Sequence, residues 1–405
     1  MSKMNAMHVC LVISGRPSEV FYGGEEKFTG SLRNYLINQG HSVTVVGRKL
    51  FGVDVIKTNE VLLAPKTRFK QPRILHVPYL VYTLTLLATS LMFILKILEI
   101  NRKSRLSILH AQDTGYGGLG GVIAAKLLRL PVIISSHGLR YNTIRNNLKG
   151  FSKAFLPLEF NIESFVSRRA NLLIVVSPSQ KAFFHKMGVE KEKVVAIPVG
   201  IKISKFKTTE EKRRSMRKEL GIQQETLFGF FGRLSPEKNL FSLLEAFAGA
   251  LKQSTTIKLI VVGTGPLEEH LKRFCKANGV LGNIIFTGAR TDIDELLSAV
   301  DVFILPSFTE GCPTALLEAM SSGKAIIASN INSILDIVKN GSEAILVHPC
   351  DSEEIKQAIL LLSKDIILRN MLSRFAQEKV KQYDVDQIYP QILNAYRVLS
   401  TAKNS

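Results

Sequence analysis

The chain has 405 residues, of which 46% are hydrophobic and 21% charged, a composition typical of a globular protein with two or three domains. This composition excludes a disordered chain. The four cysteines lack CxxC spacing and are too sparse for a disulfide scaffold, which favours a reducing compartment. The apolar run near the N-terminus is short and lacks a small-residue cleavage site, so we do not expect secretion.

Positive charge is concentrated in the first half of the chain. Residues 1–200 carry 27 Lys and Arg against 11 Asp and Glu, a net charge of +16 out of the formal +19. A basic surface of this size attracts phosphates. The phosphates can belong to a nucleic acid, an anionic lipid or a nucleotide ligand, and charge alone does not choose among them.

Short apolar runs alternate with amphipathic stretches along the chain. We expect strands at 9–14, 42–46, 107–110, 132–135 and 172–176, with helices at 25–39, 119–129, 158–169 and 179–187. Further strands are expected at 227–231, 258–262, 284–287, 302–306, 325–328 and 344–347. Two such series predict an α/β fold of two doubly wound, Rossmann-like domains. We place the domains at 1–200 and 201–384, followed by a C-terminal helix at 385–405.

One long segment, residues 74–95, contains no charged residue. It is long enough to span a bilayer, but a span there would separate the first two strands from the rest of their sheet. Six leucines fall on one helical face: Leu80, Leu84, Leu87, Leu91, Leu95 and Leu98. Four basic residues lie at or beyond the end of this stripe: Lys96, Arg102, Lys103 and Arg105. This pattern is typical of a helix at a membrane interface. The alternative is a helix buried between the sheet and the other domain.

The segment LFGFFGRLSPEKNL, at 227–240, places two cations after an expected buried strand. Gly232 at the strand end lets a ligand approach the backbone, and Arg233 and Lys238 can hold a diphosphate without a metal. Taken alone, a surface loop with solvated charges explains these residues better.

A second group of residues changes that balance. After another buried strand, a loop carries Glu310, and Pro313 suits the first turn of a helix that carries Glu318. The free amides of Thr314 and Ala315 at the start of this helix favour a phosphate. A carboxylate accepts hydrogen bonds from vicinal hydroxyls, so one Glu for a sugar and one for a ribose fits a nucleotide-sugar. Helix capping is the alternative for each Glu, and it is strongest for Glu318.

These motifs resemble the retaining glycosyltransferases of family 4, which have the GT-B fold. The resemblance rests on FGRLSPEKN, VVGTGPL (261–267), FTGAR (286–290), the Glu310-x7-Glu318 spacing and the segment YGGEEKFTGSLRNYLINQGHSVTVV (22–46). It covers most of the chain and is weakest at 50–105 and 140–170, where acceptor-binding elements usually lie. It implies two Rossmann-like domains facing across a cleft, with a last helix that crosses back to the first domain.

The resemblance also implies a role for individual residues in the second half of the chain. Arg233 and Lys238 match the pair that binds the donor diphosphate and neutralises the charge on the leaving group. Glu310 matches the residue that touches the transferred sugar, and Glu318 matches the ligand of the ribose hydroxyls.

Other positions match the family's base site, glycine loop and N-domain histidine. Ala289 and Arg290 lie where such enzymes hold the base, and Gly23 and Gly24 match the loop that closes over the phosphates. His137 matches an N-domain histidine that faces the sugar, and a structural histidine with a fixed tautomer is the alternative. We expect His110 to be structural.

Two Asp-x-Asp pairs, Asp292 with Asp294 and Asp384 with Asp386, precede helices. We interpret both as helix caps, so we expect no metal and no cofactor.

The sequence therefore predicts a metal-independent, retaining hexosyltransferase. Its donor is a nucleotide-sugar of UDP or GDP type, and its acceptor is a lipid-linked or cell-envelope glycan. We expect a cytoplasmic protein bound peripherally to the anionic inner face of the cell membrane. One alternative is the same chemistry on a soluble sugar or small metabolite. The other is a non-enzymatic protein that binds phosphate or nucleic acid, but it leaves the two glutamates unexplained, so no nucleic-acid partner is expected.

Overall fold

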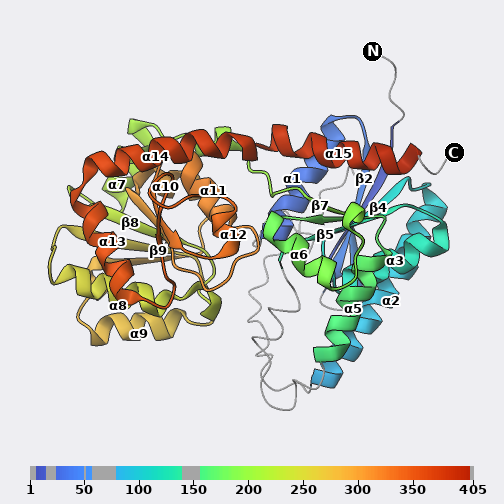
Figure 1. The fold of residues 1–405 in the computed structure, drawn as a ribbon, viewed down its shortest axis with the longest axis horizontal. Coiled ribbons are helices and arrows are strands. Elements are labelled where there is room, and N and C mark those ends of the chain that lie inside the picture. Colours follow the sequence, from blue (N-terminus) through green and yellow to red (C-terminus); the bar gives the residue numbers. More distant parts are fainter. Residues whose placement is uncertain (1–5, 15–23, 50–51, 57–78, 139–155, 402–405) are drawn as a thin grey trace. The chain divides into compact units, whose positions relative to one another are not determined.

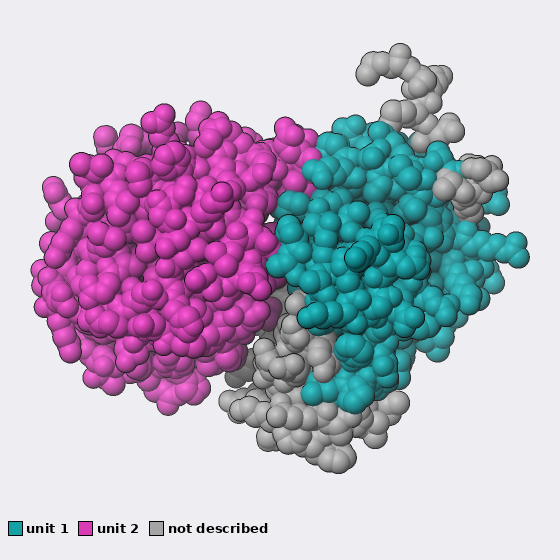
Figure 2. Space-filling model, viewed as in Figure 1, with its two compact units in different colours: residues 1–199, 389–405 teal, residues 200–388 magenta. Residues whose placement is uncertain are grey.

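The structure is a computed structural model that describes residues 6–14, 24–49, 52–56, 79–138 and 156–401. The chain forms two compact units, coloured separately in Figure 2. Unit 1 contains residues 1–199 and 389–405, and unit 2 contains residues 200–388. Each unit has its own sheet and its own core of buried apolar side chains.

The sheet of unit 1 has seven strands in the order β3-β2-β1-β4-β5-β6-β7. Strands β2, β4, β5 and β7 are labelled in Figure 1. The strands are β1 His8–Ile13, β2 Ser42–Lys49, β3 Gly52–Ile56, β4 Ile108–Ala111, β5 Val132–Ser136, β6 Leu172–Val175 and β7 Val194–Ala196. All neighbours are parallel except β3, which runs antiparallel to β2. The sequence did not predict β3 and β7, because these short edge strands lack the long apolar run of a strand buried on both faces.

Helices of unit 1 pack on this sheet and on one another. They are α1 Gly24–Asn38, α2 Tyr79–Lys103, α3 Tyr116–Leu128, α5 Leu156–Arg169, α6 Pro178–Lys186 and, from Tyr389 onward, most of α15 Val385–Thr401. Helix α2 packs against α3, and α3 packs against α5. A side chain at Gly120 would bring its Cβ to 2.8 Å from the Phe93 Cβ, so the glycine permits the close approach of α2 and α3.

Unit 2 contains a fully parallel sheet in the order β10-β9-β8-β11-β12-β13. Its strands are β8 Thr226–Phe231, β9 Ile257–Val262, β10 Ile284–Gly288, β11 Val302–Leu305, β12 Ala325–Ser329 and β13 Ile345–Val347. Its α-helices are α7 Glu210–Glu219, α8 Leu240–Leu251, α9 Glu268–Ala277, α10 Ile293–Ala299, α11 Thr314–Ser321, α12 Asn332–Leu335, α13 Ser352–Lys364 and α14 Ile366–Val380. The two doubly wound α/β units confirm the predicted fold class.

The strand order reverses once in each sheet. In unit 1 the chain moves outward from β1 to β3 and then returns to β4, and in unit 2 it moves outward from β8 to β10 and returns to β11. Ligands of open α/β sheets bind at such switch points, beyond the carboxyl ends of the two diverging strands. Ligand sites are therefore expected at the loops after β1 and β4 in unit 1, and at the loops after β8 and β11 in unit 2.

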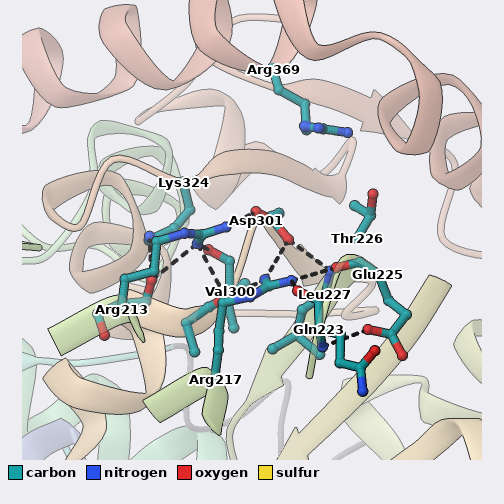
Figure 3. Close-up of polar contacts among 12 residues, drawn as sticks. Arg213, Arg217, Gln223, Glu225, Thr226, Leu227, Val300, Asp301, Lys324 and Arg369 are labelled. Carbon is teal, nitrogen blue, oxygen red and sulfur yellow. Dashed lines mark hydrogen bonds and ion pairs between the residues drawn. The ribbon is translucent and has the colours of Figure 1, made fainter. Parts of the chain in front are cut away.

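Helix α7 fixes the opposite, amino end of the unit 2 sheet (Figure 3). Arg213 and Arg217 both form ion pairs with Asp301, at 2.6 and 3.1 Å, and Asp301 also accepts a hydrogen bond from the backbone amide of Leu227 at 2.8 Å. The two guanidinium groups donate further bonds to the carbonyls of Ser298, Ala299, Val300, Gln223 and Glu225. This cluster ties α7 to the starts of β8 and β11.

Candidate functional site

The structure brings Lys238 and Glu310 together at the switch point of unit 2. Lys238 ends the short 3-10 helix Pro236–Lys238 that follows β8, and Glu310 lies in the loop that follows β11. The Lys238 ammonium donates to Glu310 Oε1 at 2.6 Å, and the side chains are 19% and 8% exposed. Parallel pairing of β8 with β11 places these two loops side by side. An ion pair this close to the surface can still be opened by a ligand.

Main-chain contacts hold the two loops together around this pair. The Phe308 amide donates to the Glu237 carbonyl at 2.9 Å, and the Asn239 side chain donates to the Pro306 carbonyl at 3.1 Å. Asn239 adopts a left-handed backbone with φ of 54°, a conformation that asparagine tolerates better than most residues. The loop carrying the cation and the loop carrying the carboxylate therefore form one preorganised unit.

Arg233 lies at the start of the same loop, but its side chain is exposed. Among the residues that the structure describes, no carboxylate forms an ion pair with it. Two glycines pack the neighbouring loop tightly against this backbone, because a Cβ at Gly263 would lie 2.0 Å from the Gly232 carbonyl oxygen. A Cβ at Gly265 would similarly lie 2.3 Å from the Leu234 carbonyl oxygen. Both glycines belong to the VVGTGPL motif, so the motif has a backbone-packing role that the sequence did not reveal.

Helix α11 begins immediately beyond the Glu310 loop. Thr314 and Ala315 are its first residues, so their amides have no acceptor within the helix and remain available to an anion. Pro313 occupies the N-cap, one residue before the first turn in which it was expected. Glu318 lies one turn into α11 and is 7% exposed.

The Arg290 side chain is engaged elsewhere. Its guanidinium donates to Asp292 and to Glu219 of α7, the latter at 3.2 Å. These two carboxylates raise the pKa of Arg290, and the guanidinium in turn lowers the pKa of Asp292. Of the two residues predicted to lie at the base, exposed Ala289 and the Arg290 main chain remain open to a ligand more readily than the Arg290 side chain.

The predicted capping role is wrong for Asp292 and correct for Asp384. Asp292 occupies the N-cap of α10, but its carboxylate caps no amide because Arg290 binds it, and Asp294 pairs with Lys212 at 3.0 Å. A guanidinium two residues away offers charged, forked hydrogen bonds that outcompete a neutral amide. Asp384 does accept a bond from the Asp386 amide at 2.9 Å. Within the described ranges, no group of three or more His, Cys, Asp or Glu is arranged to hold a metal ion.

In unit 1, His137 follows β5 and lies beside the end of β4. Its Nε2 donates to Gln112 Oε1 at 3.0 Å, and its ring packs edge-on against Phe28 at 4.9 Å between centroids. Burial lowers the pKa of His137 to about 4, so the ring is neutral at pH 7. Gln112, a fully buried residue that belongs to none of the sequence motifs, orients this histidine.

His110, expected to be structural, is completely buried. Its two ring nitrogens are hydrogen-bonded to Tyr396 of α15 at 2.6 Å and to Ser135 of β5 at 2.7 Å. Gly24 begins α1, and a Cβ placed there meets no atom beyond its own helical turn within 4 Å among the residues that the structure describes. Gly23 lies outside the described residues.

Helix α2 presents the middle of the predicted leucine stripe to solvent, whereas Leu98 is half-buried. Residues 74–78 of the uncharged segment and the side chains of Leu80 and Leu84 lie outside the described part of the chain. Leu87, Leu91 and Leu95 are 39%, 56% and 59% exposed, and Met92 beside them is 41% exposed. The opposite face is buried against α3, where the Ser90 hydroxyl donates to the Tyr116 carbonyl at 2.8 Å. Glu99, near the end of the helix, is paired with Lys96 and Lys103, both at 2.7 Å. No helix in the described part of the chain is long and apolar enough to cross a bilayer.

Two models of known protein families match the chain in succession. Residues 22–205 match "Glycosyltransferase Family 4", and residues 212–379 match "Glycosyl transferases group 1". The matches cover the glycine-loop region and both loops of the unit 2 site.

Curated relatives are similar to the chain at moderate identity. A UDP-Gal:alpha-D-GlcNAc-diphosphoundecaprenol alpha-1,3-galactosyltransferase of Escherichia coli is 29% identical over 71% of this chain and 74% of its own. An N,N'-diacetylbacillosaminyl-diphospho-undecaprenol alpha-1,3-N-acetylgalactosaminyltransferase of Campylobacter jejuni is 29% identical over 68% and 73%. An alpha-monoglucosyldiacylglycerol synthase of Streptococcus pneumoniae is 32% identical over 58% and 54%.

Solved structures share the fold. Sucrose-phosphate synthase from Thermosynechococcus elongatus is 20% identical, with a TM-score of 0.81 over 98% of this chain and 100% of its own. HepE from Anabaena, solved in complex with UDP-glucose, is 20% identical, with a TM-score of 0.74 over 97% and 100%.

Proposed function

The chain belongs to the family 4 glycosyltransferases of group 1 and has their GT-B fold, and on this premise we propose that it transfers a hexose, with retention, from a nucleotide-sugar to a lipid-linked glycan. The observation that carries the proposal is the Lys238–Glu310 pair at the unit 2 switch point. A cation for a diphosphate and a carboxylate for a sugar lie within one hydrogen bond of each other there.

Each part of the donor has a matching group in unit 2. Lys238 and exposed Arg233 bind the diphosphate, and the first amides of α11 add two neutral donors. Glu310 accepts hydrogen bonds from the sugar, and Glu318 accepts them from the ribose. The main chain at 289–290 faces the base. HepE was solved with UDP-glucose, which supports a UDP-hexose before a GDP-sugar as the donor.

The proposed chemistry is the same-face displacement that the family resemblance implies. The acceptor hydroxyl oxygen bonds to the anomeric carbon on the face from which the bond to the donor phosphate breaks. The hydroxyl proton passes to the departing phosphate oxygen. Lys238 and Arg233 neutralise the negative charge that develops on the diphosphate, a preorganised electrostatic effect that contributes strongly to catalysis. Neutral His137 serves the sugar as a hydrogen-bonding group and not as a cation.

A lipid-linked acceptor is supported by two relatives and by the surface of α2. The E. coli and C. jejuni relatives are named for undecaprenol diphosphate-linked acceptors. The exposed leucines of α2 and the basic residues after them form an amphipathic surface suited to an anionic bilayer. We therefore place the reaction at the cytoplasmic face of the membrane, with the protein bound peripherally.

A donor screen tests the enzymatic part of the proposal. The purified protein is heated with UDP-, GDP- and ADP-sugars, and a ligand that binds the folded state raises its melting temperature. We expect a rise with a UDP-hexose, followed by transfer to an undecaprenol diphosphate-linked glycan. A protein that responds to no nucleotide-sugar would contradict the proposal.

Flotation with liposomes tests the membrane part. We expect wild type to float with phosphatidylglycerol vesicles at low salt. The double variant Leu91→Glu/Leu95→Glu should float about tenfold less, because charges replace two exposed leucines that would insert into the bilayer. The matched control is Ile366→Glu/Ile367→Glu on α14, where two isoleucines are 58% and 80% exposed. Equal flotation of both double variants, or a wild type that stays in the soluble fraction, favours a soluble acceptor instead.

A further inference from the structure

The sugar-binding carboxylate has a second partner besides Lys238. The hydroxyl of Ser307 donates to Glu310 Oε1 at 2.6 Å, the same oxygen and the same distance as for the lysine. We propose that Ser307 is a positioning residue, which holds the Glu310 carboxylate in place for the transferred sugar while Lys238 serves the donor diphosphate. The inference deepens the proposed function and rests on it.

Ser307 is itself rigidly placed. It lies two residues after β11 and is 0% exposed. Both of its chain neighbours are fixed to the Lys238 loop: the Pro306 carbonyl accepts from the Asn239 side chain at 3.1 Å, and the Phe308 amide donates to the Glu237 carbonyl at 2.9 Å. With the backbone held on both sides, only rotation about the Cα–Cβ bond of Ser307 can move the hydroxyl away from the carboxylate.

The two donors differ in what a bound donor does to them. Lys238 is 19% exposed and positively charged, so an arriving diphosphate shares its ammonium group and weakens its bond to Glu310. Ser307 is neutral and fully buried, so neither the diphosphate nor water competes for its hydroxyl. Ser307 is therefore the contact with Glu310 that persists in the donor complex.

The geometry also selects the oxygen that meets the sugar. Within the described residues, both side-chain hydrogen bonds to the Glu310 carboxylate end on Oε1. A carboxylate has two oxygens, each with two acceptor sites. Oε2 is therefore the oxygen offered to the sugar hydroxyls, and Ser307 determines the direction in which it points.

The test compares binding of UDP with binding of the nucleotide-sugar that wild type uses. For Ser307→Ala, calorimetry should give a dissociation constant for UDP within about twofold of wild type. The dissociation constant for the nucleotide-sugar should rise, so the ratio of the UDP dissociation constant to the nucleotide-sugar dissociation constant should fall about tenfold. The value of kcat should also fall about tenfold, because a hydrogen bond to a charged group is lost. Ser307→Thr keeps the hydroxyl and should restore both values.

The matched control is Ser329→Ala. Ser329 ends β12, the strand that pairs with β11, and it is also 0% exposed. Its hydroxyl has no hydrogen-bond partner in the part of the chain that the structure describes. Removing this oxygen also alters a buried serine at the carboxyl end of the sheet, but it should leave the binding ratio and kcat unchanged.

Three results would overturn the inference alone: a wild-type ratio and kcat in Ser307→Ala, an equal weakening of UDP and nucleotide-sugar binding, or the same effect from Ser329→Ala. The last two would mean that the substitution loosens the loop in general. A wild-type protein that binds no nucleotide-sugar overturns the proposed function as well, and that result is seen before any variant is made.

Discussion

The two ends of the unit 2 sheet carry the same kinds of charged side chain in opposite states. At the amino end, Arg213, Arg217 and Asp301 satisfy one another and the surrounding backbone carbonyls (Figure 3). At the carboxyl end, Glu310 uses one oxygen, and Arg233 is exposed without an ion pair among the described residues.

The number of partners per charge therefore separates a structural cluster from a candidate binding site. A buried charge whose hydrogen bonds are all made holds elements together, and breaking it leaves a costly unpaired group. A charge that keeps spare hydrogen-bonding capacity beside a switch point is available to a ligand. Residue type alone does not distinguish the two ends.

Substitutions of the site residues at the carboxyl end of the sheet should have the greatest effect. Lys238→Ala and Glu310→Ala should each lower turnover on the order of 100-fold, because each removes a group that acts on the diphosphate or the sugar. Melting temperatures should fall only slightly, because the Lys238 side chain reaches water and Ser307 still donates to Glu310 when Lys238 is removed. Steady-state kinetics with the identified donor measure the effect.

Lys212→Ala is the control for these variants. Lys212 also forms a lysine–carboxylate pair in unit 2, with Asp294 at 3.0 Å, but it lies on α7. Its turnover should match wild type. Wild-type turnover in Lys238→Ala or Glu310→Ala would contradict the roles given to these residues.

A substitution in the arginine–aspartate cluster at the amino end of the sheet should lower stability. Asp301→Ala leaves two arginines and the Leu227 amide without their acceptor, so the free energy of unfolding should fall by about 2 kcal/mol. Urea denaturation measures the loss. Turnover per folded molecule should not change, and a fall comparable with that of Lys238→Ala would mean that the two ends are not separate in function.

A pH effect in unit 1 should be weaker than the two effects in unit 2. It concerns His110, a buried side chain with both ring nitrogens hydrogen-bonded, which can take up a proton. Burial, and then the neighbouring His137, lowers the pKa of His110 from 6.5 to about 3. The unfolded chain therefore binds the proton more readily, so this stability is complete above pH 6.5 and is lost as the pH falls below it. At pH 5.5 the loss is about 1.4 kcal/mol.

Urea denaturation at pH 7.5 and 5.5 checks this value. His110→Asn should be less stable than wild type at pH 7.5 but should lose less on acidification. The variant keeps the part of the pH dependence of the free energy of unfolding that comes from His137, because burial lowers the pKa of His137 to about 4. An unchanged slope in His110→Asn would show that His110 is not the titrating group.

Much of the site could be predicted from the sequence, because its residues lie at short, fixed spacings after two predicted strands. The spacing of Gly232, Arg233 and Lys238 after one strand, and of Glu310 and Glu318 after another, places them at strand ends without any knowledge of distant contacts. Parallel strands then bring those ends to one edge. Lys238 and Glu310 meet there at 2.6 Å, although 72 positions separate them in the chain.

Other features depended on contacts that no local pattern contains. Asp292 has the sequence context of a cap, yet Arg290 captures its carboxylate. Ser307 and Gln112 are ordinary polar residues in the sequence, and only their burial beside Glu310 and His137 gives them a role.

Local sequence patterns were enough to predict two doubly wound units, the loops proposed to carry the chemistry and the apolar stripe of α2, because apolar periodicity and strand-end motifs are local properties of the chain. Tertiary contacts were needed to show which charges are saturated, which oxygen of Glu310 has no hydrogen bond among the described residues, and which face of α2 meets solvent. Those properties depend on neighbours brought together by folding, because hydrogen bonding and burial act over a few ångströms in space, whatever the separation along the chain.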